Sequence, residues 1–370
     1  MILSRTKTIS VKAMVGLSAP LSLRRVGVPK EIKQHEYRVS MTPSGVQTLI
    51  KRGCDVFVET NAGTAAGFSD NDYKESGAHI VSKTEVFKYS DMIVKVKEPL
   101  PNEYSLIKEN QVVFTFFHFA GIPGLEDEMG HAGAICIAYE TVQKQDGYLP
   151  ILAPMSEVAG RLAIQEGMRF LTKNNNGKGI LLSGIPGVEP TKVVVIGAGT
   201  VGTNAAQLAA GLGARVYILD NNLEKLRQLS NTMPKNIYTI YSTETSLKEH
   251  LKNADLVVGG VLIPGKAAPK LVSSEMLMNM SEGSVFVDVA IDQGGMTDVS
   301  KATSHNDPVF KHGPVTMYCV ANMPGIVPNT STNGLTNATL PYVVSLATDG
   351  LYGAVEKYPE LKNAISSRGK

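Results

Sequence analysis

The feature that most constrains the fold of this 370-residue chain is a glycine-rich turn between a hydrophobic strand and a helix. Residues 192–197 (KVVVIG) are typical of a strand, and residues 203–213 of a helix that ends at glycine. In this setting the first glycine permits a tight turn, the second lets a pyrophosphate approach, and the third lets helix and strand pack closely. The residues that would bind a dinucleotide here are Gly197, Gly199, Thr200, Val201 and Gly202.

The strand that follows the helix supports the same interpretation. Residues 215–220 (RVYILD) end in Asp220, whose carboxylate can accept a hydrogen bond from a ribose 2′-hydroxyl and would repel a 2′-phosphate. The next residues are Asn221 and Asn222 with no arginine among them, so NAD is favoured over NADP. The alternative is a glycine turn in an α/β unit that binds no nucleotide.

Short apolar and β-branched runs alternate with helical stretches along the rest of the chain, which predicts α/β units with mainly parallel sheets. The runs expected to form strands are RVGVPKE, DVFVET, AHIV, DMIVKV, QVVFTFF, AICIAYE, KVVVIG, RVYILD, IYTIY, ADLVVGGV, SVFVDVA and MYCVAN. Between the first two, Thr42 is the expected N-cap of a helix, with Pro43 at its first position and Gly53 at its end.

Residues 154–173 read as one long amphipathic helix, capped by Ser156, that connects two such units. A final helix over about 332–350 is expected to return to the first unit. We therefore expect one domain from 26–153 and 326–370, and a dinucleotide-binding domain over 154–325.

Composition excludes several classes of function. Lys and Arg number 36 against 34 Asp and Glu, so the net charge of +2 is too small for a nucleic-acid binder that works by neutralising phosphates. The three cysteines are odd in number and widely spaced, which predicts no disulfide framework. The seven histidines include no HxxxH or HExxH pair, so no metal site is expected.

Two segments bear on the location of the protein in the cell and on whether it crosses a membrane. Residues 1–25 lack Asp and Glu but carry five basic residues among Ser and Thr, which weakly resembles an organellar transit peptide; a disordered extension, or a start at Met14, is the alternative. Residues 193–214 are uncharged and long enough to suggest a membrane span, but their five glycines fit a glycine loop entering a helix better. We expect no membrane span.

Four side chains outside the glycine turn are candidate site residues. His118 follows an apolar strand, where open α/β sheets place ligand groups, and it titrates near neutral pH; a core histidine is equally compatible. Lys97 shares a strand face with Lys95, which suggests an anion, although exposed lysines at a strand end are the more ordinary explanation. Asp292 follows the strand SVFVDVA, and Arg38 could form a forked pair with a small acid; an Asx-turn and a surface ion pair are the alternatives.

A series of short segments resembles the alanine dehydrogenase family in order and spacing, over about residues 26 to 350. They are RVGVPKEIK, EYRVSMTP, KVKEP, FTFFHFA, AYETV, APMSEVAGR, GIPGV, VIGAGTVGTNAA, VLIPG, VDVAIDQGG, VANMPG and LTNATLPY. The resemblance implies two Rossmann-like, doubly wound domains separated by a cleft. It also implies NAD-dependent oxidation of L-alanine to pyruvate and ammonia by a homo-oligomer, commonly a hexamer. We expect a cytoplasmic location, with a mitochondrion or other organelle as the alternative if residues 1–25 are a transit peptide.

The resemblance also implies roles for the candidate residues. Arg38 and Lys97 would hold the substrate carboxylate and carbonyl, and His118 would be the general acid/base. Asp292 would assist proton transfer or orient the ammonium group. Ser156, Lys225 and Asn322 would join the glycine loop and Asp220 in binding the cofactor.

A related fold occurs in the NAD-binding subunit of proton-translocating transhydrogenase. That subunit typically has Asn and Ala in the stretch where this chain has KVKEP, and it lacks a catalytic histidine at the position of His118. Both differences favour the dehydrogenase. A protein that binds NAD without catalysis is a third alternative, which turnover of alanine would exclude.

Overall fold

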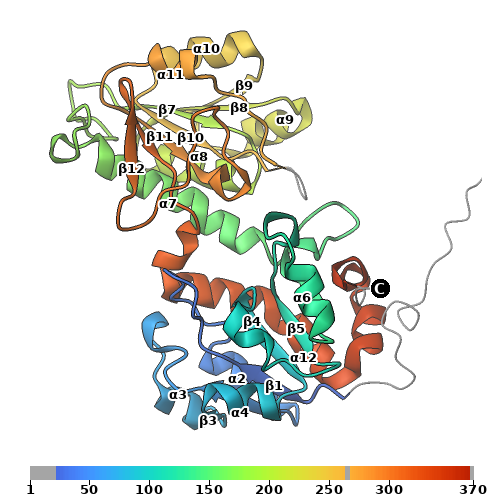
Figure 1. Cartoon of the computed structure of the whole chain (residues 1–370). Helices are drawn as coiled ribbons and strands as arrows, with labels where there is room; N and C mark the ends of the chain where they lie inside the picture. The colour runs from blue at the N-terminus through green and yellow to red at the C-terminus, as the bar shows by residue number, and fades with distance from the viewer. Residues whose placement is uncertain (1–21, 263–266, 367–370) are drawn as a thin grey trace, which may run out of the picture. The chain divides into compact units, whose positions relative to one another are not determined.

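The computed structural model describes residues 22–262 and 267–366, which form two compact units (Figure 1). The first unit contains the chain up to Met155 and the segment from Gly325 onward, and the second runs from Ser156 to Pro324. The domain boundaries expected from the sequence, after residues 153 and 325, lie close to these. Most of the N-terminal extension lies outside the described residues. Its last residues, from 22 onward, are described: Leu23 is buried in the core, and Arg25 begins the first strand.

The first unit is built on a six-stranded sheet in the order β3-β2-β1-β4-β5-β6, and every neighbouring pair is parallel. Its strands are β1 (Arg25–Val28), β2 (Asp55–Glu59), β3 (His79–Val81), β4 (Met92–Lys97), β5 (Val112–Phe116) and β6 (Ile135–Ala138). All six were expected from short apolar runs. Because the strands are parallel, the loops that leave their carboxyl ends gather at one edge of the sheet.

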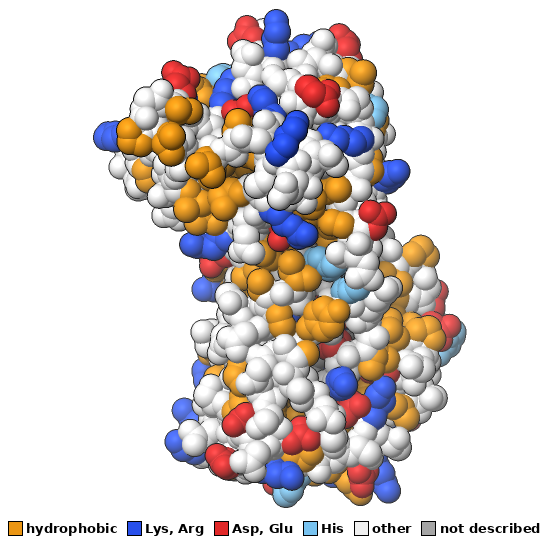
Figure 2. Space-filling model, turned by 90° about the vertical axis from the view of Figure 1, so that its left-hand side faces the viewer, with side chains coloured by type: hydrophobic (Ala, Val, Ile, Leu, Met, Phe, Trp, Pro, Cys, Tyr) orange, Lys and Arg blue, Asp and Glu red, His pale blue; other side chains and the backbone are white. Residues whose placement is uncertain are grey.

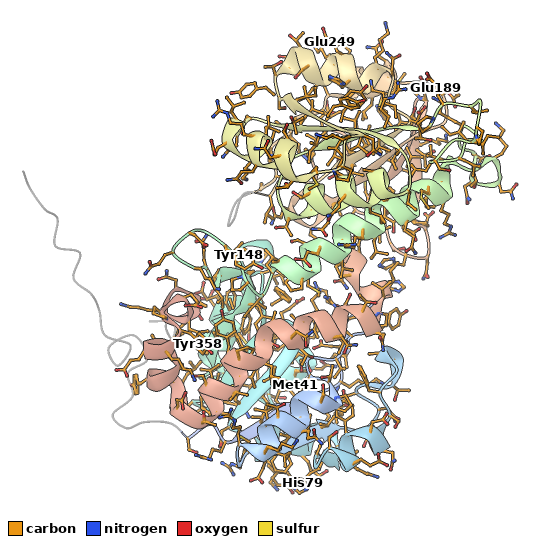
Figure 3. All side chains as sticks on the ribbon, turned by 180° about the vertical axis from the view of Figure 1, so that it is seen from behind. Met41, His79, Tyr148, Glu189, Glu249 and Tyr358 are labelled. Carbon is orange, nitrogen blue, oxygen red and sulfur yellow. The ribbon has the colours of Figure 1, made fainter. Side chains whose placement is uncertain are left out.

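Helices cover both faces of this sheet. They are α2 (Pro43–Lys51), α3 (Asp70–Glu75), α4 (Lys83–Tyr89), α5 (Pro101–Tyr104), α6 (Leu125–His131) and α12 (Pro328–Lys357). Helix α12 returns to this unit as expected, but it extends beyond the predicted 332–350 at both ends. Its backbone leaves the helical region at Gly350, where φ is 70°, so the predicted end is the site of a kink. Figure 3 shows Met41 inside the unit and His79 on the outer strand β3.

The second unit contains a seven-stranded sheet in the order β12-β13-β11-β10-β7-β8-β9. Its strands are β7 (Lys192–Ile196), β8 (Arg215–Asp220), β9 (Ile237–Tyr241), β10 (Leu256–Gly259), β11 (Ser284–Asp288), β12 (Val309–His312) and β13 (Val315–Tyr318). Six of these are parallel, whereas β12 pairs antiparallel with β13 at the edge of the sheet. The sequence analysis missed β12, because its four residues (VFKH) lack an apolar run. Both units are therefore Rossmann-like α/β domains.

The helices of the second unit are α7 (Ala153–Leu171), α8 (Thr200–Gly211), α9 (Leu223–Thr232), α10 (Glu244–Lys252) and α11 (Ser274–Met278). Helix α8 opens at the glycine turn, as predicted. The expectation that Ser156 caps α7 is wrong, because the helix already begins at Ala153 and Ser156 lies inside its first turn. Basic and acidic side chains are interspersed on the face shown in Figure 2, in keeping with the small net charge.

Two further observations concern the described residues only. Cys54, Cys136 and Cys319 are buried and form no disulfide. Over residues 22–262 and 267–366, the structure contains no helix with both the length and the apolar character that a membrane crossing requires.

Helix α2 illustrates how local sequence sets an element boundary in the first unit. Thr42 is extended, and its hydroxyl oxygen accepts a hydrogen bond from the backbone N–H of Gly45 at 3.2 Å, while Pro43 occupies the first helical position. Gly53, just beyond the helix, has a φ of +77°, which favours glycine. The predicted cap, proline and glycine stop are all confirmed.

Thr42→Ala should destabilise the first unit by about 1 kcal/mol, because the N–H of Gly45 loses its capping acceptor. Urea denaturation followed by circular dichroism measures this. Gln47→Ala, on the exposed side of the same helix, is the control and should leave the midpoint nearly unchanged. Equal effects of the two substitutions would contradict the capping role.

Candidate functional site

The glycine turn between β7 and α8 leaves no room for side chains at two of its positions. A Cβ atom at Gly202 would lie 1.8 Å from the carbonyl oxygen of Gly197, so the start of α8 touches the backbone at the end of β7. Gly197 itself has a φ of +99°. At Gly199, in contrast, a Cβ atom would meet nothing within 4 Å, so this backbone borders open space. The turn at Gly197 and the close packing at Gly202 agree with the roles that the sequence predicted, whereas the approach of a pyrophosphate to Gly199 stays a prediction.

The open space at Gly199 faces the beginning of α8. Gly199 is the N-cap residue of that helix, and no side chain caps its first turn. The N–H groups of the first turn and the positive end of the helix dipole are therefore suited to an anion. Thr200 and Val201 lie in this turn.

Asp220 lies at the end of β8 and is bonded to the same turn. Its Oδ2 accepts a hydrogen bond from the N–H of Ala198, and its Oδ1 accepts one from the N–H of Asn222, both at 2.7 Å. The carboxylate thus holds the glycine loop while keeping further acceptor capacity for a hydroxyl. Lys225 follows in the first turn of α9 and is exposed.

Helix α7 packs directly on the start of α8. A Cβ atom at Gly160 would lie 2.2 Å from the carbonyl oxygen of Val201, so the two backbones are in contact at this point. Ser156 precedes Gly160 by four residues, which places it on the same face of α7 one turn earlier. This explains how a residue far from the glycine motif in sequence comes to the same region.

Asp292 lies in η5 (Val289–Gln293), after the end of β11. The side chain is exposed, and its two oxygens accept the backbone N–H of Asn322 at 3.2 and 3.4 Å. Asn322 adopts a left-handed conformation with a φ of 57°. The loop that carries Asp292 is organised by buried Asp288, which accepts hydrogen bonds from Ala290, Met296 and Ser300 at the loop's two ends.

Arg38, in the first unit, is a buried residue and not a surface one. Its Nε and Nη2 donate to the two carboxylate oxygens of Glu36 at 2.7 and 2.6 Å, and both side chains are almost fully buried. Arg38 Nη1 also lies 3.0 Å from the sulfur of Met155. The forked pair that the sequence suggested with a substrate therefore exists within the chain, with Glu36, and it fixes the plane of the guanidinium.

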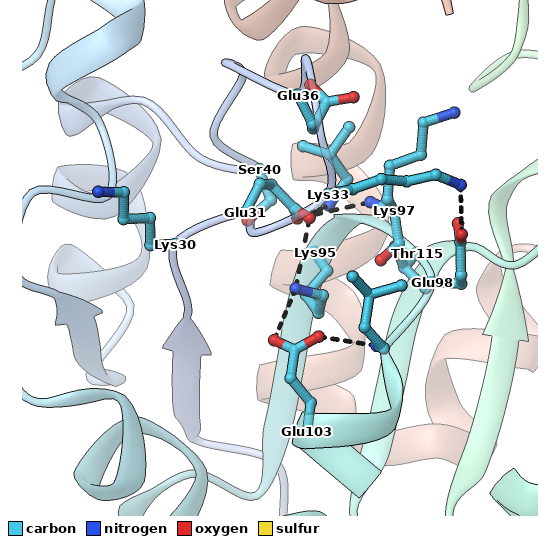
Figure 4. Close-up of polar contacts among 12 residues, drawn as sticks. Lys30, Glu31, Lys33, Glu36, Ser40, Lys95, Lys97, Glu98, Glu103 and Thr115 are labelled. Atoms are coloured by element: carbon cyan, nitrogen blue, oxygen red, sulfur yellow. Dashed lines mark hydrogen bonds and ion pairs between the residues drawn. The ribbon is translucent and has the colours of Figure 1, made fainter.

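Lys95 and Lys97 have different environments, although they were expected on one face. Lys95 is fully buried and pairs with Glu31 at 3.3 Å and Glu103 at 3.1 Å (Figure 4). Neither explanation offered for it, an anion site or an exposed strand end, is correct. Lys97 is half-buried at the last position of β4.

His118 comes two residues after β5 and has a left-handed backbone, with φ 52° and ψ 41°. Its N–H and that of Phe117 donate to the carboxylate of Glu140 at 2.5 and 3.3 Å, and its ring stacks on Phe116 at 5.7 Å between centroids. Reduced hydration of the ring, and then the positive charge of Lys97, lowers the pKa of His118 below its usual 6.5. Since the residue is exposed, solvent screening limits this shift, but its direction favours the neutral, proton-accepting ring.

The structure brings the candidates together in two groups, one in each unit. Lys97 ends β4, and Arg38 and His118 follow the neighbouring strands β1 and β5; the charges of both cations act on the ring of His118. In the second unit, Asp220 ends β8, and the glycine turn, Asp292 and Asn322 follow β7, β11 and β13. All therefore lie at the carboxyl edges of parallel strands.

The sequence analysis missed four carboxylates of the first unit that bind basic side chains or backbone N–H groups. Glu36 binds Arg38, Glu140 binds the backbone at His118, and Glu31 and Glu103 bind Lys95. A signal was present for Glu140, since it follows the apolar run ICIAY at a strand end just as His118 does. In the described part of the chain, no three His, Cys, Asp or Glu side chains are close enough to hold a metal ion.

Comparison with known proteins decides the family. Residues 27–159 match the model of the alanine dehydrogenase/PNT N-terminal domain, and residues 163–370 match that of the C-terminal domain. The chain belongs to the alanine dehydrogenase/PNT family. Among curated relatives, it is 48% identical to an alanine dehydrogenase of Mycobacterium tuberculosis, over 93% of both chains. It is 51% identical to alanine dehydrogenase 2 of Staphylococcus aureus, over 93% of this chain and 92% of the relative.

Solved structures agree with this assignment. An L-alanine dehydrogenase structure superimposes with a TM-score of 0.89 at 46% identity, covering 93% of this chain and 96% of the other. The transhydrogenase from Sinorhizobium meliloti superimposes with a TM-score of 0.81 at 24% identity, covering 93% and 99%. The second similarity shows a shared fold only.

Removal of the Glu36 carboxylate should show how much the buried ion pair with Arg38 contributes to the stability of the first unit. Glu36→Ala leaves the guanidinium without its forked partner and should destabilise the first unit by on the order of 3 kcal/mol. The shift of the urea midpoint measures this. Glu244→Ala, which breaks the exposed pair between Glu244 and Lys248, is the control and should shift the midpoint little. A small effect of Glu36→Ala would contradict the importance assigned to the buried pair.

Proposed function

We propose that this chain is an NAD-dependent alanine dehydrogenase. The reaction converts L-alanine, NAD⁺ and water to pyruvate, ammonium, NADH and a proton, and it is reversible. The observation that carries the proposal is the identity of 48–51% to curated alanine dehydrogenases over nearly the whole length of both chains. Arg38, Lys97 and His118, at the carboxyl ends of β1, β4 and β5, supply the charged and proton-accepting groups that such a reaction needs.

The residues of the second unit fit a dinucleotide. The open space at Gly199 and the uncapped first turn of α8 suit a pyrophosphate, contacted by Gly197, Thr200, Val201 and Gly202. Asp220 would accept the ribose hydroxyls. Ser156, Lys225 and Asn322 complete the set of proposed cofactor contacts. When bound, NAD⁺ supplies the acceptor for the hydride that leaves Cα of alanine.

In the first unit, Arg38 and Lys97 bind the carboxylate and the carbonyl oxygen of the substrate. Their positive charge stabilises negative charge that develops on oxygen when water adds to the imine carbon of the oxidised amino acid. His118, whose lowered pKa keeps the ring neutral near pH 7, accepts a proton from the ammonium group or from that water. Asp292 orients the ammonium group or assists the proton transfer.

The assembly and location of the protein are part of the same proposal. We infer a homo-oligomer, a hexamer, that acts on small molecules in the cytoplasm. A mitochondrial or other organellar location is the alternative, if residues 1–25 act as a transit peptide. Light scattering coupled to size exclusion measures the number of subunits, and a fluorescent fusion with and without residues 1–25 tests the location.

The activity test is the appearance of NADH absorbance with L-alanine and NAD⁺, and its loss with pyruvate and ammonium. His118→Ala should lower kcat by about 10²- to 10⁴-fold, the usual contribution of a general acid/base. Its affinity for NADH, measured by fluorescence, should stay close to native. The control is His131→Ala, an exposed histidine at the end of α6. No turnover of alanine by the native chain would refute the function, and near-native kcat in His118→Ala would refute the role of His118.

Two glycine substitutions should separate cofactor binding from folding. Gly199→Ala places a methyl group in open space, so the melting temperature should stay native while the Kd for NADH rises about tenfold or more, since the backbone must approach the pyrophosphate. Gly202→Ala collides with the carbonyl of Gly197 and should lower the melting temperature as well. Calorimetry and fluorescence titration measure the two quantities. Native affinity in Gly199→Ala would contradict the pyrophosphate site.

A further inference from the structure

Strand β4 is irregular where it approaches Lys97. It pairs in register with β5 through Met92, Ile93 and Val94, and the register then shifts before Lys97 pairs with Phe116. A shift of this kind breaks the regular ladder of backbone hydrogen bonds, so the polar groups of residues 94–97 need other partners. Such irregularities re-aim side chains at the ends of strands.

Three side chains from outside β4 bond to the backbone at this shift (Figure 4). The Oε1 atom of Glu31 accepts the N–H of Val96 at 2.6 Å and that of Lys97 at 3.4 Å. The hydroxyl of Thr115 donates to the carbonyl of Lys97 at 2.8 Å, and that of Ser40 donates to the carbonyl of Val94 at 2.6 Å. The backbone that carries Lys97 is thus held on both its N–H and its C=O side by side chains.

Glu31 can hold this backbone because Lys95 compensates its charge. Both residues are buried, and Lys95 Nζ lies 3.3 Å from Glu31 Oε2 and 3.1 Å from Glu103 Oε1. Burial raises the pKa of Glu31, and the ammonium of Lys95 opposes that rise. Burial likewise acts to lower the pKa of Lys95, but Glu31 and Glu103 outweigh it and raise that pKa. Lys95 therefore remains a cation.

The segment after β1 contacts the end of β4 at a second point. Lys33 pairs with Glu98, the residue after Lys97, so two residues of the same short segment bracket Lys97. Glu103, in contrast, uses its other oxygen to accept the N–H of Leu100 at the start of α5. The two glutamates that share Lys95 therefore bind different parts of the backbone, and only Glu31 binds that of Lys97.

We propose that Glu31 is a positioning residue for Lys97: its carboxylate, held in place by buried Lys95, sets the backbone from which Lys97 reaches the substrate. Thr115 acts with it from the carbonyl side. The inference rests on the proposed function, in which Lys97 binds the substrate. It adds the buried ion pair between Glu31 and Lys95 as the element that fixes the direction of Lys97.

Glu31→Gln tests the proposal. The amide keeps the shape of the side chain but lacks the charge and one of the two acceptor oxygens, so the backbone at Lys97 loses its fixed position. The expected result is a fall in kcat/KM for pyruvate of about 10- to 100-fold, as small displacements of a binding group can cause. The Kd for NADH should change by less than about twofold, because the proposed cofactor residues lie in the other unit.

Glu103→Gln is the matched control, since it makes the same chemical change in the same ion network. It should lower the melting temperature to a similar extent but leave kcat/KM within about threefold of native. In a Lys97→Ala background, Glu31→Gln should change kcat/KM by less than about twofold, because a residue that acts through Lys97 has nothing left to position. A merely structural role would cost the same in both backgrounds.

Three results would overturn the inference: native kinetics in Glu31→Gln, equal kinetic losses in Glu31→Gln and Glu103→Gln, or an undiminished loss in the Lys97→Ala background. If Glu31→Gln does not fold, Thr115→Val removes the hydroxyl that holds the carbonyl of Lys97 and should lower kcat/KM severalfold; native kinetics there would also overturn it. Absence of turnover in the native chain would refute the proposed function instead.

Discussion

The first unit depends on carboxylates that are buried beside backbone N–H groups at the ends of parallel strands. Removing a carboxylate from water costs several kcal/mol, which only opposite charge and hydrogen bonds can offset. Glu31 and Glu36 meet this cost with Lys95 and Arg38, and each also accepts a backbone N–H. Glu140 accepts two N–H groups at the position of His118. The anions thus shape the backbone from which the cations and the histidine project.

In the second unit, the candidate anion site is formed by the backbone and not by charged side chains. This site requires positions without side chains. Gly202 lets α8 begin against the carbonyl of Gly197, and Gly160 lets α7 lie against that of Val201. Because these contacts are between backbone atoms, no adjustment of a rotamer could relieve an added methyl group. The position that borders open space, Gly199, is the one where a ligand could come closest.

Much of this was accessible from the sequence, and the failures have identifiable causes. Apolar runs located twelve of the thirteen strands in the described part of the chain, because buried parallel strands are continuously hydrophobic. The edge strand β12 lacks that pattern, because two of its four residues (VFKH) are polar and none of the four is buried. Helix α7 starts at Ala153, so Ser156 lies inside its first turn and is not its N-cap. The glycine turn was predicted in full, because its constraints lie within a few consecutive residues.

The lysines of β4 show what the sequence of a single strand cannot predict. Alternation along a strand indicates which face a residue occupies, but it presumes a regular ladder and says nothing about the partners on that face. Here the register shifts between Val94 and Lys97, and the partner that explains the shift, Glu31, lies 65 residues from Val96. A lysine that balances an internal carboxylate and a lysine that we propose to bind the substrate therefore look identical in sequence. What marks Lys95 as the internal one is its burial between Glu31 and Glu103, and that is a property of the folded chain alone.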